Sequence, residues 1–286
     1  MKYQKVIPAI FVSRPNRFIA KVRIAEDENG VAAGADRRQS AAETNAPLEM
    51  VHVKNTGRCR ELLVPGCRVY LAESDNTERK TKYDLVAVEK NAAWLTGPDV
   101  EGGLDGLSGS TEAGLVEPSG NTEAGSGTLL INMDSQAPND AAEEWLNAGG
   151  NGLFSESAIV RREVTFGSSR FDFYLEDGER KAFLEVKGCT LEEGGIARFP
   201  DAPTERGVKH VEELEKALAD GYEAYLLIVI QMKPMKEFRP NDETHKAFGD
   251  ALRHAAKTGV KILAYDCLVT PDSMTIDAPV PVGLEY

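Results

Sequence analysis

The chain has 286 residues, enough for one large domain or for two domains of ordinary size. Hydrophobic residues make up 42% of it and charged residues 28%, which supports a packed core and excludes a chain that is disordered throughout. No apolar run approaches the roughly 20 residues that a membrane-spanning helix needs, and the first residues lack the features of a secretory signal. We therefore expect a cytoplasmic protein with no membrane partner.

The formal net charge of -13 would disfavour a nucleic-acid partner if it were evenly spread. Residues 97–126, however, hold six acidic and no basic residues, and residues 25–47 hold five acidic and two basic residues. These two segments carry -9 of the -13, so only -4 is left for the rest of the chain. The overall acidity therefore excludes neither a nucleic-acid partner nor a local basic surface.

The residues before position 97 have the pattern of a β domain. Short alternating segments predict strands, Pro65-Gly66 is a turn signal, and the polar, Ala-rich residues 25–47 predict an enlarged hairpin loop. Several short strands within 1–96 are typical of a small barrel or sandwich. The predicted strands span residues 17–24, 48–53, 67–73 and 83–90, and residues 92–95 close the segment.

Residues 97–127 form the boundary to the second half of the chain. They are rich in Gly and Ser, contain the near-repeat GSTEAG and GNTEAG, and have almost no apolar periodicity. Such a segment buries too little apolar surface to offset the entropy of ordering it. It predicts a flexible acidic linker or a long surface loop.

Residues 128–286 have the pattern of an α/β domain with a mixed sheet. Residues 222–231 are apolar on both faces, which predicts a buried central strand. The other predicted elements are a helix at 138–146, strands at 162–175 and 181–191 joined by a turn at 176–178, a strand-like extension after them, helices at 204–220 and 243–257, and a strand at 260–269.

The four cysteines indicate neither a zinc site nor a disulfide framework. None of them forms a CxxC pair, and their spacing fits no zinc pattern. They are also too sparse for a disulfide scaffold in a chain of this length. We expect buried free thiols at Cys59, Cys67, Cys189 and Cys267.

The two strands around the turn at 176–178 carry the sharpest chemical pattern. Side-chain alternation predicts that Phe171 and Phe173 face a core while Asp172 points to the other side. In the second strand, Glu185 and Lys187 share a face. If the strands pair through the turn, Asp172 and Glu185 come close together, with Lys187 about 7 Å further along the same face.

Two neighbouring carboxylates repel each other, and a divalent cation such as Mg²⁺ or Mn²⁺ resolves the conflict. Asp172 and Glu185 are therefore candidate metal ligands, and Lys187 is a candidate for positioning the attacking water in phosphodiester cleavage. The alternative is an ordinary solvated face of a hairpin, which the pattern alone would favour. Two observations favour the site instead: the strands are otherwise strongly apolar, and the charged positions fall inside them.

Several motifs in a fixed order resemble the sugar fermentation stimulation protein A (SfsA) family. The resemblance covers nearly the whole chain except the two acidic insertions. It implies an OB-like domain at 1–96, a PD-(D/E)xK nuclease fold at 128–286, the triad Asp172, Glu185 and Lys187, and an association with DNA or RNA cleavage and DNA binding. The motifs are SSRFDFYL, FLEVKGCTL, ARFPDAPTERGVKHVEEL, NRFIAKV, NTGRCRELLVPG and ERKTKYDL.

The chain departs from the family pattern at three places. Phe171 stands where the proline that names the nuclease motif would be, a position at which the superfamily varies. Val53-Lys54 replace a Cys-Pro pair, and Pro15-Asn16 replace a basic-aromatic pair. The departures therefore concern the contacts of the OB-like domain more than the triad.

Candidate nucleic-acid contacts lie in both halves. An OB barrel binds single strands with basic and aromatic side chains, and Arg58 and Lys80 are the candidates there, with Arg60, Arg79 and Lys82 beside them. Residues 48–94 hold eight Lys or Arg and seven Asp or Glu, so an ordinary solvated surface is an equal alternative.

In the second half, the candidate phosphate contacts are Arg170, Arg206 and Lys209. Arg206 and Lys209 lie near the start of the predicted helix at 204–220, where anions bind favourably. Lys209 would otherwise pair with Glu213 one turn on. Three further polar residues have other expected roles. Asp201 is expected to cap this helix rather than to act as an outer ligand, His210 to be structural, and Gln231 to face the site.

The leading interpretation is a metal-dependent nuclease acting on DNA or RNA. The alternative is a non-catalytic DNA-binding regulatory protein of sugar metabolism, and a scaffold protein without a ligand is a third. The sequence does not distinguish DNA from RNA, single from double strands, or endo- from exonuclease action. A homodimer also stays open.

Overall fold

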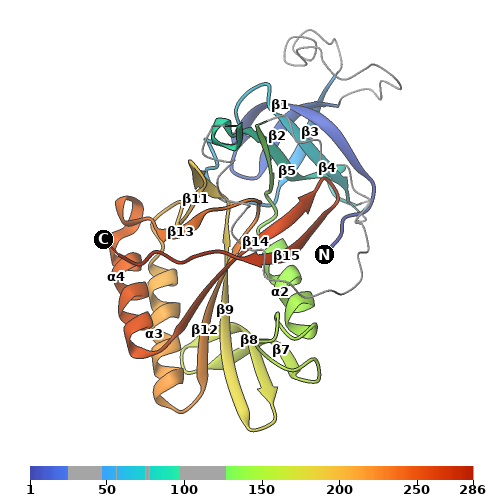
Figure 1. The fold of residues 1–286 in the computed structure, drawn as a ribbon. Helices are drawn as coiled ribbons and strands as arrows, with labels where there is room; N and C mark the ends of the chain where they lie inside the picture. The colour runs from blue at the N-terminus through green and yellow to red at the C-terminus, as the bar shows by residue number, and fades with distance from the viewer. Residues whose placement is uncertain (25–46, 56, 75, 77, 97–126, 286) are drawn as a thin grey trace, which may run out of the picture.

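The computed structural model describes residues 1–24, 47–55, 57–74, 76, 78–96 and 127–285 (Figure 1). The loop predicted at 25–47 and the linker predicted at 97–127 lie outside the described residues, apart from Pro47 and Gly127.

The N-terminal half folds as a six-stranded sheet in the order β3-β2-β1-β4-β5-β6. A further parallel pairing between β3 and β5, with His52 opposite Asp84, closes the sheet on itself as a barrel. All four predicted strands are present. The bounds are β1 Val6–Asn16, β2 Ile19–Ile24, β3 Leu48–Val53, β4 Arg68–Glu73, β5 Tyr83–Asn91 and β6 Thr128–Asn132, with a 3-10 turn at Ala93–Thr96.

Strand β1 was not predicted, because two prolines interrupt its sequence pattern. Pro8 is nevertheless accommodated, since it is paired with Tyr70 of β4 while the ladder with β2 begins at Ala9. Strand β6 also differs from the prediction, which assigned residue 128 onward to the second half. It pairs with β5 from Ala87↔Asn132 to Asn91↔Thr128, so it belongs to the barrel sheet.

The C-terminal half contains a six-stranded sheet in the order β15-β14-β12-β9-β8-β7. Strands β9, β12 and β14 are parallel and the other pairings are antiparallel, as a mixed sheet requires. The buried strand predicted at 222–231 is β12, in the middle of this sheet. The bounds are β7 Ile159–Phe166, β8 Ser169–Asp177, β9 Arg180–Cys189, β12 Glu223–Ile230, β14 Lys261–Thr270 and β15 Ser273–Pro279.

The single strand predicted at 162–175 is wrong: two antiparallel strands, β7 and β8, meet there at a turn. Gly167 has a φ of 55°, a left-handed conformation that reverses the chain between them. The prediction also missed β15, and it gave only a strand-like extension where β10 and β11 of a small sheet in the order β10-β11-β13 lie. The bounds of the small sheet are β10 Leu191–Glu193, β11 Ile196–Phe199 and β13 Glu237–Pro240.

Helices cover both faces of the main sheet (Figure 1). Helix α2 (Ala137–Asn147) packs on one face, and α3 (Glu205–Ala219) with α4 (Asp242–Thr258) packs on the other. The predicted cap of α3 at Asp201 is wrong, because Thr204 caps this helix by accepting a hydrogen bond from the Gly207 N–H.

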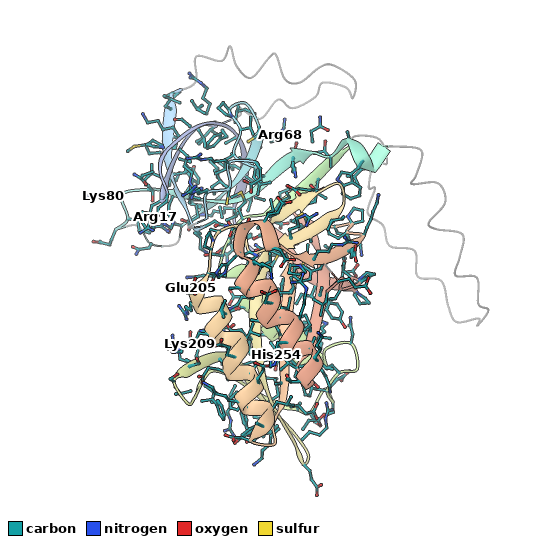
Figure 2. All side chains as sticks on the ribbon, turned by 90° about the vertical axis from the view of Figure 1, so that its left-hand side faces the viewer. Arg17, Arg68, Lys80, Glu205, Lys209 and His254 are labelled. Carbon is teal, nitrogen blue, oxygen red and sulfur yellow. The ribbon has the colours of Figure 1, made fainter. Side chains whose placement is uncertain are left out.

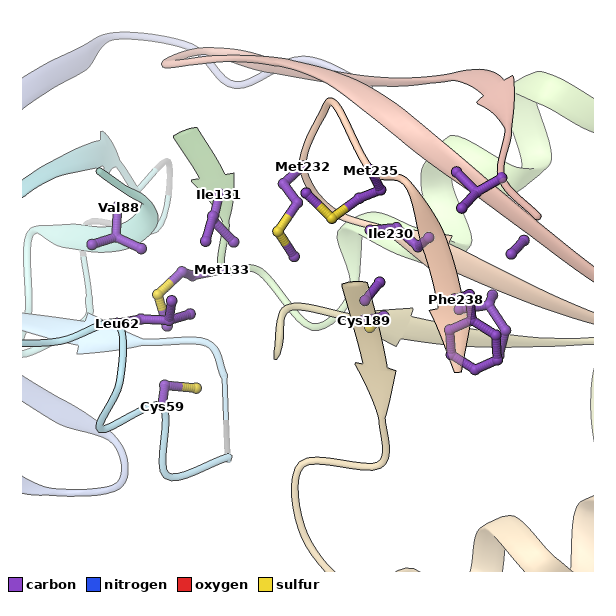
Figure 3. Packing of buried hydrophobic residues seen from close by; sticks show 14 of the residues in the cluster. Cys59, Leu62, Val88, Ile131, Met133, Cys189, Ile230, Met232, Met235 and Phe238 are labelled. Carbon is purple, nitrogen blue, oxygen red and sulfur yellow. The ribbon is translucent and has the colours of Figure 1, made fainter. Parts of the chain in front are cut away.

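The barrel and the main sheet are joined by a continuous core. Figure 3 shows Met133 on the barrel side of this junction and Met232 and Met235 on the side of the second sheet, and all three are buried. Two ion pairs cross the junction, Lys54–Asp134 and Lys90–Glu192, and both carboxylates have only 1% of their side-chain surface exposed. These contacts fix the barrel against the sheet.

Candidate active site

The candidate site lies where strands β8 and β9 separate. Their backbone register runs from Asp177↔Arg180 to Phe173↔Leu184 and ends there. Asp172 and Glu185 are the next residues of the two strands, and the charge of Glu185 acts on Asp172. In place of a backbone bond, the Val186 N–H donates to Oδ2 of Asp172 at 2.8 Å.

The predicted alternation of β8 is wrong at Phe171. This side chain packs in the core with Phe183 on the side of α3 and α4, whereas Phe173 packs in the core on the side of α2. In β7, Glu163 lies between the partners of Phe173 and Phe171 and has a φ of 56°. Asp172 is hydrogen-bonded to α2, while Glu185 is hydrogen-bonded to α3 on the other face, so the predicted common face of the two carboxylates is wrong.

Glu185 is 2% exposed, and its two oxygens differ in their surroundings. Oε1 accepts hydrogen bonds from Lys187 Nζ and from His210 Nδ1. Oε2 is buried and has no hydrogen-bond partner among the described residues. Burial raises the pKa of this carboxyl, but the hydrogen bonds from His210 and Lys187 outweigh burial and hold the pKa below its ordinary value.

Asp172 has the opposite pKa shift. Burial, and next to it the charge of Glu185, hold the pKa of the Asp172 carboxyl above its ordinary value. The bonds from the Val186 N–H and from Asn139 Nδ2, the latter at 2.9 Å to Oδ1, offset this only in part. Asp172 therefore carries a like-charge conflict of the kind that a cation relieves.

The donor set fits a divalent cation with few protein ligands. Glu185 Oε2 is an unpartnered buried oxygen beside a second carboxylate, and Mg²⁺ is commonly held by one or two carboxylates and water. Within the described ranges, no cluster of three or more His, Cys, Asp or Glu side chains is arranged as a metal site. A site with more protein ligands, such as a structural zinc site, does not fit these residues.

Two contacts of the triad were not predicted as site residues. Asn139 comes from α2, and the prediction treated His210 as structural. His210 is 5% exposed and lies on the buried stripe of α3 with Gly207, Val211 and Leu214. A histidine on this otherwise apolar stripe was the sequence signal for a polar contact in the interior, because a buried histidine needs a polar partner.

The three predicted phosphate contacts of the second half are exposed. Arg206 is exposed, and its Nε donates to His210 Nε2 at 3.3 Å. Lys209 does not pair with Glu213; its Nζ donates to the Ser168 carbonyl in the turn between β7 and β8 at 3.2 Å. Arg170 has 60% of its side chain exposed, beside Glu163 at 3.2 Å.

The two barrel candidates, Arg58 and Lys80, lie on the surface of the first half. Both are exposed. In Figure 2, Lys80 lies on the barrel and Lys209 on α3, both toward the left-hand side of the view. Among the basic candidates of both halves, Arg206 is thus linked to Glu185 through His210.

Gln231 lies at the junction between the two halves. Its Nε2 donates to the Asn132 carbonyl at 3.0 Å and to the Asp134 carbonyl at 3.1 Å. Its Oε1 lies so near the backbone of β9 that a Cβ at Gly188 would be 2.6 Å from it. The residue is thus next to the strand that carries Glu185 and Lys187.

Comparison with known proteins agrees with this architecture. Residues 12–96 match the family model described as the SfsA N-terminal OB domain, and residues 136–273 match the Sugar fermentation stimulation protein RE domain. The sugar fermentation stimulation protein homolog of Desulfitobacterium hafniense DCB-2 is 49% identical over 96% of this chain and 94% of its own. The chain belongs to the SfsA family.

Other SfsA proteins support the same assignment. The homolog of Ruminiclostridium cellulolyticum is 44% identical over 99% of this chain and 100% of its own length. The solved structure of Pyrococcus furiosus SfsA in complex with Ca²⁺ has a TM-score of 0.70 and covers 99% of this chain and 98% of its own, at 23% identity. The expected fold, an OB barrel followed by a mixed-sheet domain, is confirmed.

None of the helices in the described residues is both long and apolar enough to span a membrane. All four cysteines are free, and three are buried, with Cys67 only partly so. Burial raises the pKa of the Cys59 and Cys189 thiols to about 12, which makes them poor nucleophiles.

Proposed function

We propose that this protein is a metal-dependent nuclease that hydrolyses phosphodiester bonds in DNA or RNA. One observation carries the proposal: Asp172, Glu185 and Lys187 meet where β8 and β9 separate, with a buried carboxylate oxygen left without a partner. The Ca²⁺ bound to Pyrococcus furiosus SfsA supports a divalent cation in this family.

Asp172 and Glu185 would hold the cation, Mg²⁺ or Mn²⁺. When bound, it supplies charge stabilisation for the phosphoryl group and a more acidic water. Lys187 has its ammonium group at Glu185 and only 16% of its side chain exposed, so it is placed to orient the attacking water. Arg170, Arg206 and Lys209 supply positive charge for the substrate backbone around the carboxylates.

The alternative is a non-catalytic DNA-binding regulatory protein of sugar metabolism. One observation favours it. Lys187 and His210 already hydrogen-bond to Glu185 Oε1, so part of its charge is balanced without any cation. Under this alternative the triad would be a structural polar cluster, and the basic residues of α3 and the barrel would bind DNA.

Cleavage of labelled DNA and RNA, single- and double-stranded, distinguishes the two functions. The wild type is compared at low salt with Mg²⁺, Mn²⁺ or EDTA, beside Asp172→Ala and Lys187→Ala. Lys181→Ala is the matched control, because Lys181 lies on the same strand β9 but is exposed and four residues before Glu185. The nuclease proposal expects metal-dependent cleavage that both site variants lose and the control keeps.

Absence of cleavage of all four substrates, with binding kept in every variant, would leave the regulatory protein as the function. Cleavage that persists at the wild-type rate in both site variants would remove the triad from the reaction.

A further inference from the structure

A cavity of about 190 Å³ lies between the barrel and the second sheet, next to the triad. Gly188, the residue after Lys187, forms part of its wall. The barrel contributes the loop around Asn55, and the second half contributes the end of β9, strand β11 and the loop before α3. The lining residues are Asn55, Gly57, Ser135, Gly188, Thr190, Leu191, Arg198, Phe199, Asp201 and Gln231.

The barrel side of this cavity is held in place by Arg14. Its guanidinium donates to the main-chain carbonyls of Asn55 and Arg17 at 2.6 Å, and of Gly57 and Arg58 at 2.8 Å. The Asn55 side chain also accepts from the Gly57 N–H at 2.8 Å. Arg14 therefore holds Asn55, Gly57 and Arg58 against β1.

The two halves meet closely around the cavity. A Cβ at Gly57 would lie 2.5 Å from Oδ2 of Asp201, so only glycine lets this carboxylate approach the barrel loop. The ion pair Lys54–Asp134 and the bond from Ser135 Oγ to the Lys54 carbonyl, at 2.6 Å, close the neighbouring part of the junction. The cavity is thus a product of the domain arrangement.

The size of the cavity selects a single ring. A cavity of about 150 Å³ holds one benzene molecule, so a cavity of about 190 Å³ has room for one six-membered ring with its exocyclic groups. A base pair does not fit into that volume. A nucleic acid therefore reaches it only with an unpaired base.

The chemistry of the lining selects a base over a phosphate. Asn55 Nδ2, Gln231 Oε1 and the Thr190 hydroxyl are groups that hydrogen-bond to base edges, whereas Gln231 Nε2 already donates to main-chain carbonyls. The lining also holds one cation, Arg198, whose guanidinium is paired with Glu193 at 3.1 Å. The Asp201 carboxylate repels a phosphate but accepts a hydrogen bond from an exocyclic amino group, as acidic side chains do from cytosine N4. Leu191 and Phe199 supply apolar surface for a ring.

We propose that this cavity binds one unpaired nucleobase next to the scissile phosphate and prefers cytosine to thymine or uracil. The inference rests on the proposed function in taking a nucleic acid as the substrate. It makes single-stranded or locally opened nucleic acid the substrate class, because the base must leave its pair to enter. Asp201 is the specificity-determining residue.

The test measures binding in EDTA, so it does not depend on cleavage. Oligo(dC) and oligo(dT) of equal length compete with a labelled single strand in fluorescence anisotropy. We expect wild type to bind oligo(dC) about five- to tenfold more tightly, the lower range for reading one base. Asp201→Asn should bring the two affinities within about twofold of each other, because an amide can pair with either base edge.

Two further variants keep the result interpretable. Asp220→Asn is the matched control, an exposed residue at the far end of α3, and it should keep the wild-type preference. Thr190→Ile fills the cavity while keeping a β-branched side chain between β9 and β10, and it should abolish the preference even if Asp201→Asn does not fold. Equal affinity of wild type for both oligonucleotides, or a preference unchanged in Asp201→Asn or Thr190→Ile, would overturn the inference.

Cleavage and base preference separate the two proposals. A cytosine preference without any cleavage would support the cavity and refute the nuclease, whereas cleavage without the preference would refute the cavity alone.

Discussion

His210 Nδ1 is hydrogen-bonded to Oε1 of Glu185, the oxygen that Lys187 also contacts, and Oε2 has no partner among the described residues. The Arg206 guanidinium donates to the other ring nitrogen, Nε2, at 3.3 Å. Because arginine has no acceptor, Nε2 must accept and Nδ1 must carry the proton in the neutral ring. Arg206 and His210 therefore help to orient the Glu185 carboxylate.

Replacing His210 by alanine should weaken cation binding. The loss of a group that orients a metal ligand typically costs 10- to 100-fold in affinity, and we expect a decrease of about tenfold or more for Mn²⁺, measured by titration calorimetry. His254→Ala is the control, since His254 is a 69% exposed histidine that pairs with Glu215 away from the triad. Equal Mn²⁺ affinities of His210→Ala and wild type would show that His210 does not position Glu185.

The triad could be predicted from the sequence because it depends on local pairing. Asp172 and Glu185 lie on two strands joined by a tight turn, so strand pairing places them at neighbouring positions. Asn139 and His210 contact them from helices 33 and 25 residues away, and no short-range pattern relates such positions. The change of face between Phe171 and Phe173 left no mark in the apolar alternation of β8.

The basic residues around the triad should bind the substrate backbone without reading its sequence. Each phosphate contact removed lowers the slope of log affinity against log salt by about one. Arg170→Ala and Lys209→Ala should each do so and together lower it by about two, measured by anisotropy with one oligonucleotide over a series of salt concentrations. Lys257→Ala, at an exposed lysine in the last turn of α4, should keep the wild-type slope. An unchanged slope in the double variant would exclude these side chains as phosphate contacts.

The ion pair between Lys90 and Glu192 should contribute more to stability than a surface pair does. Lys90 Nζ donates at 2.7 Å both to Oε2 and to the main-chain carbonyl of Glu192, whose side chain is 1% exposed. Lys90→Met leaves a buried charge without its partner and should lower the free energy of unfolding by about 3 kcal/mol in urea denaturation. The double variant with Glu192→Gln should lose less than the sum of the single variants, because it removes the unpaired charge. Additive losses would mean that the two side chains stabilise the protein independently.

The opposite end of the main sheet holds a cluster that should make stability depend on pH. Arg180, then Tyr225 and Lys261, donate to Glu223 across three neighbouring strands and lower the pKa of its carboxyl from 4.5 to about 2. A carboxyl with a lowered pKa in the folded state stabilises the protein fully above its unfolded pKa, and this contribution is lost as the pH falls from about 4.5 toward 2. Glu223→Gln should therefore melt below wild type at neutral pH, and the difference should narrow over that acidic range.

Circular dichroism melts of both proteins across the pH series measure this difference. Glu179→Gln, at the exposed neighbour of Arg180, serves as the control and should follow the wild-type curve throughout. A difference between Glu223→Gln and wild type that is constant from neutral pH to pH 2 would mean that the glutamate acts through packing. In that case the charge of Glu223 would not stabilise the contacts between the first residues of β9, β12 and β14.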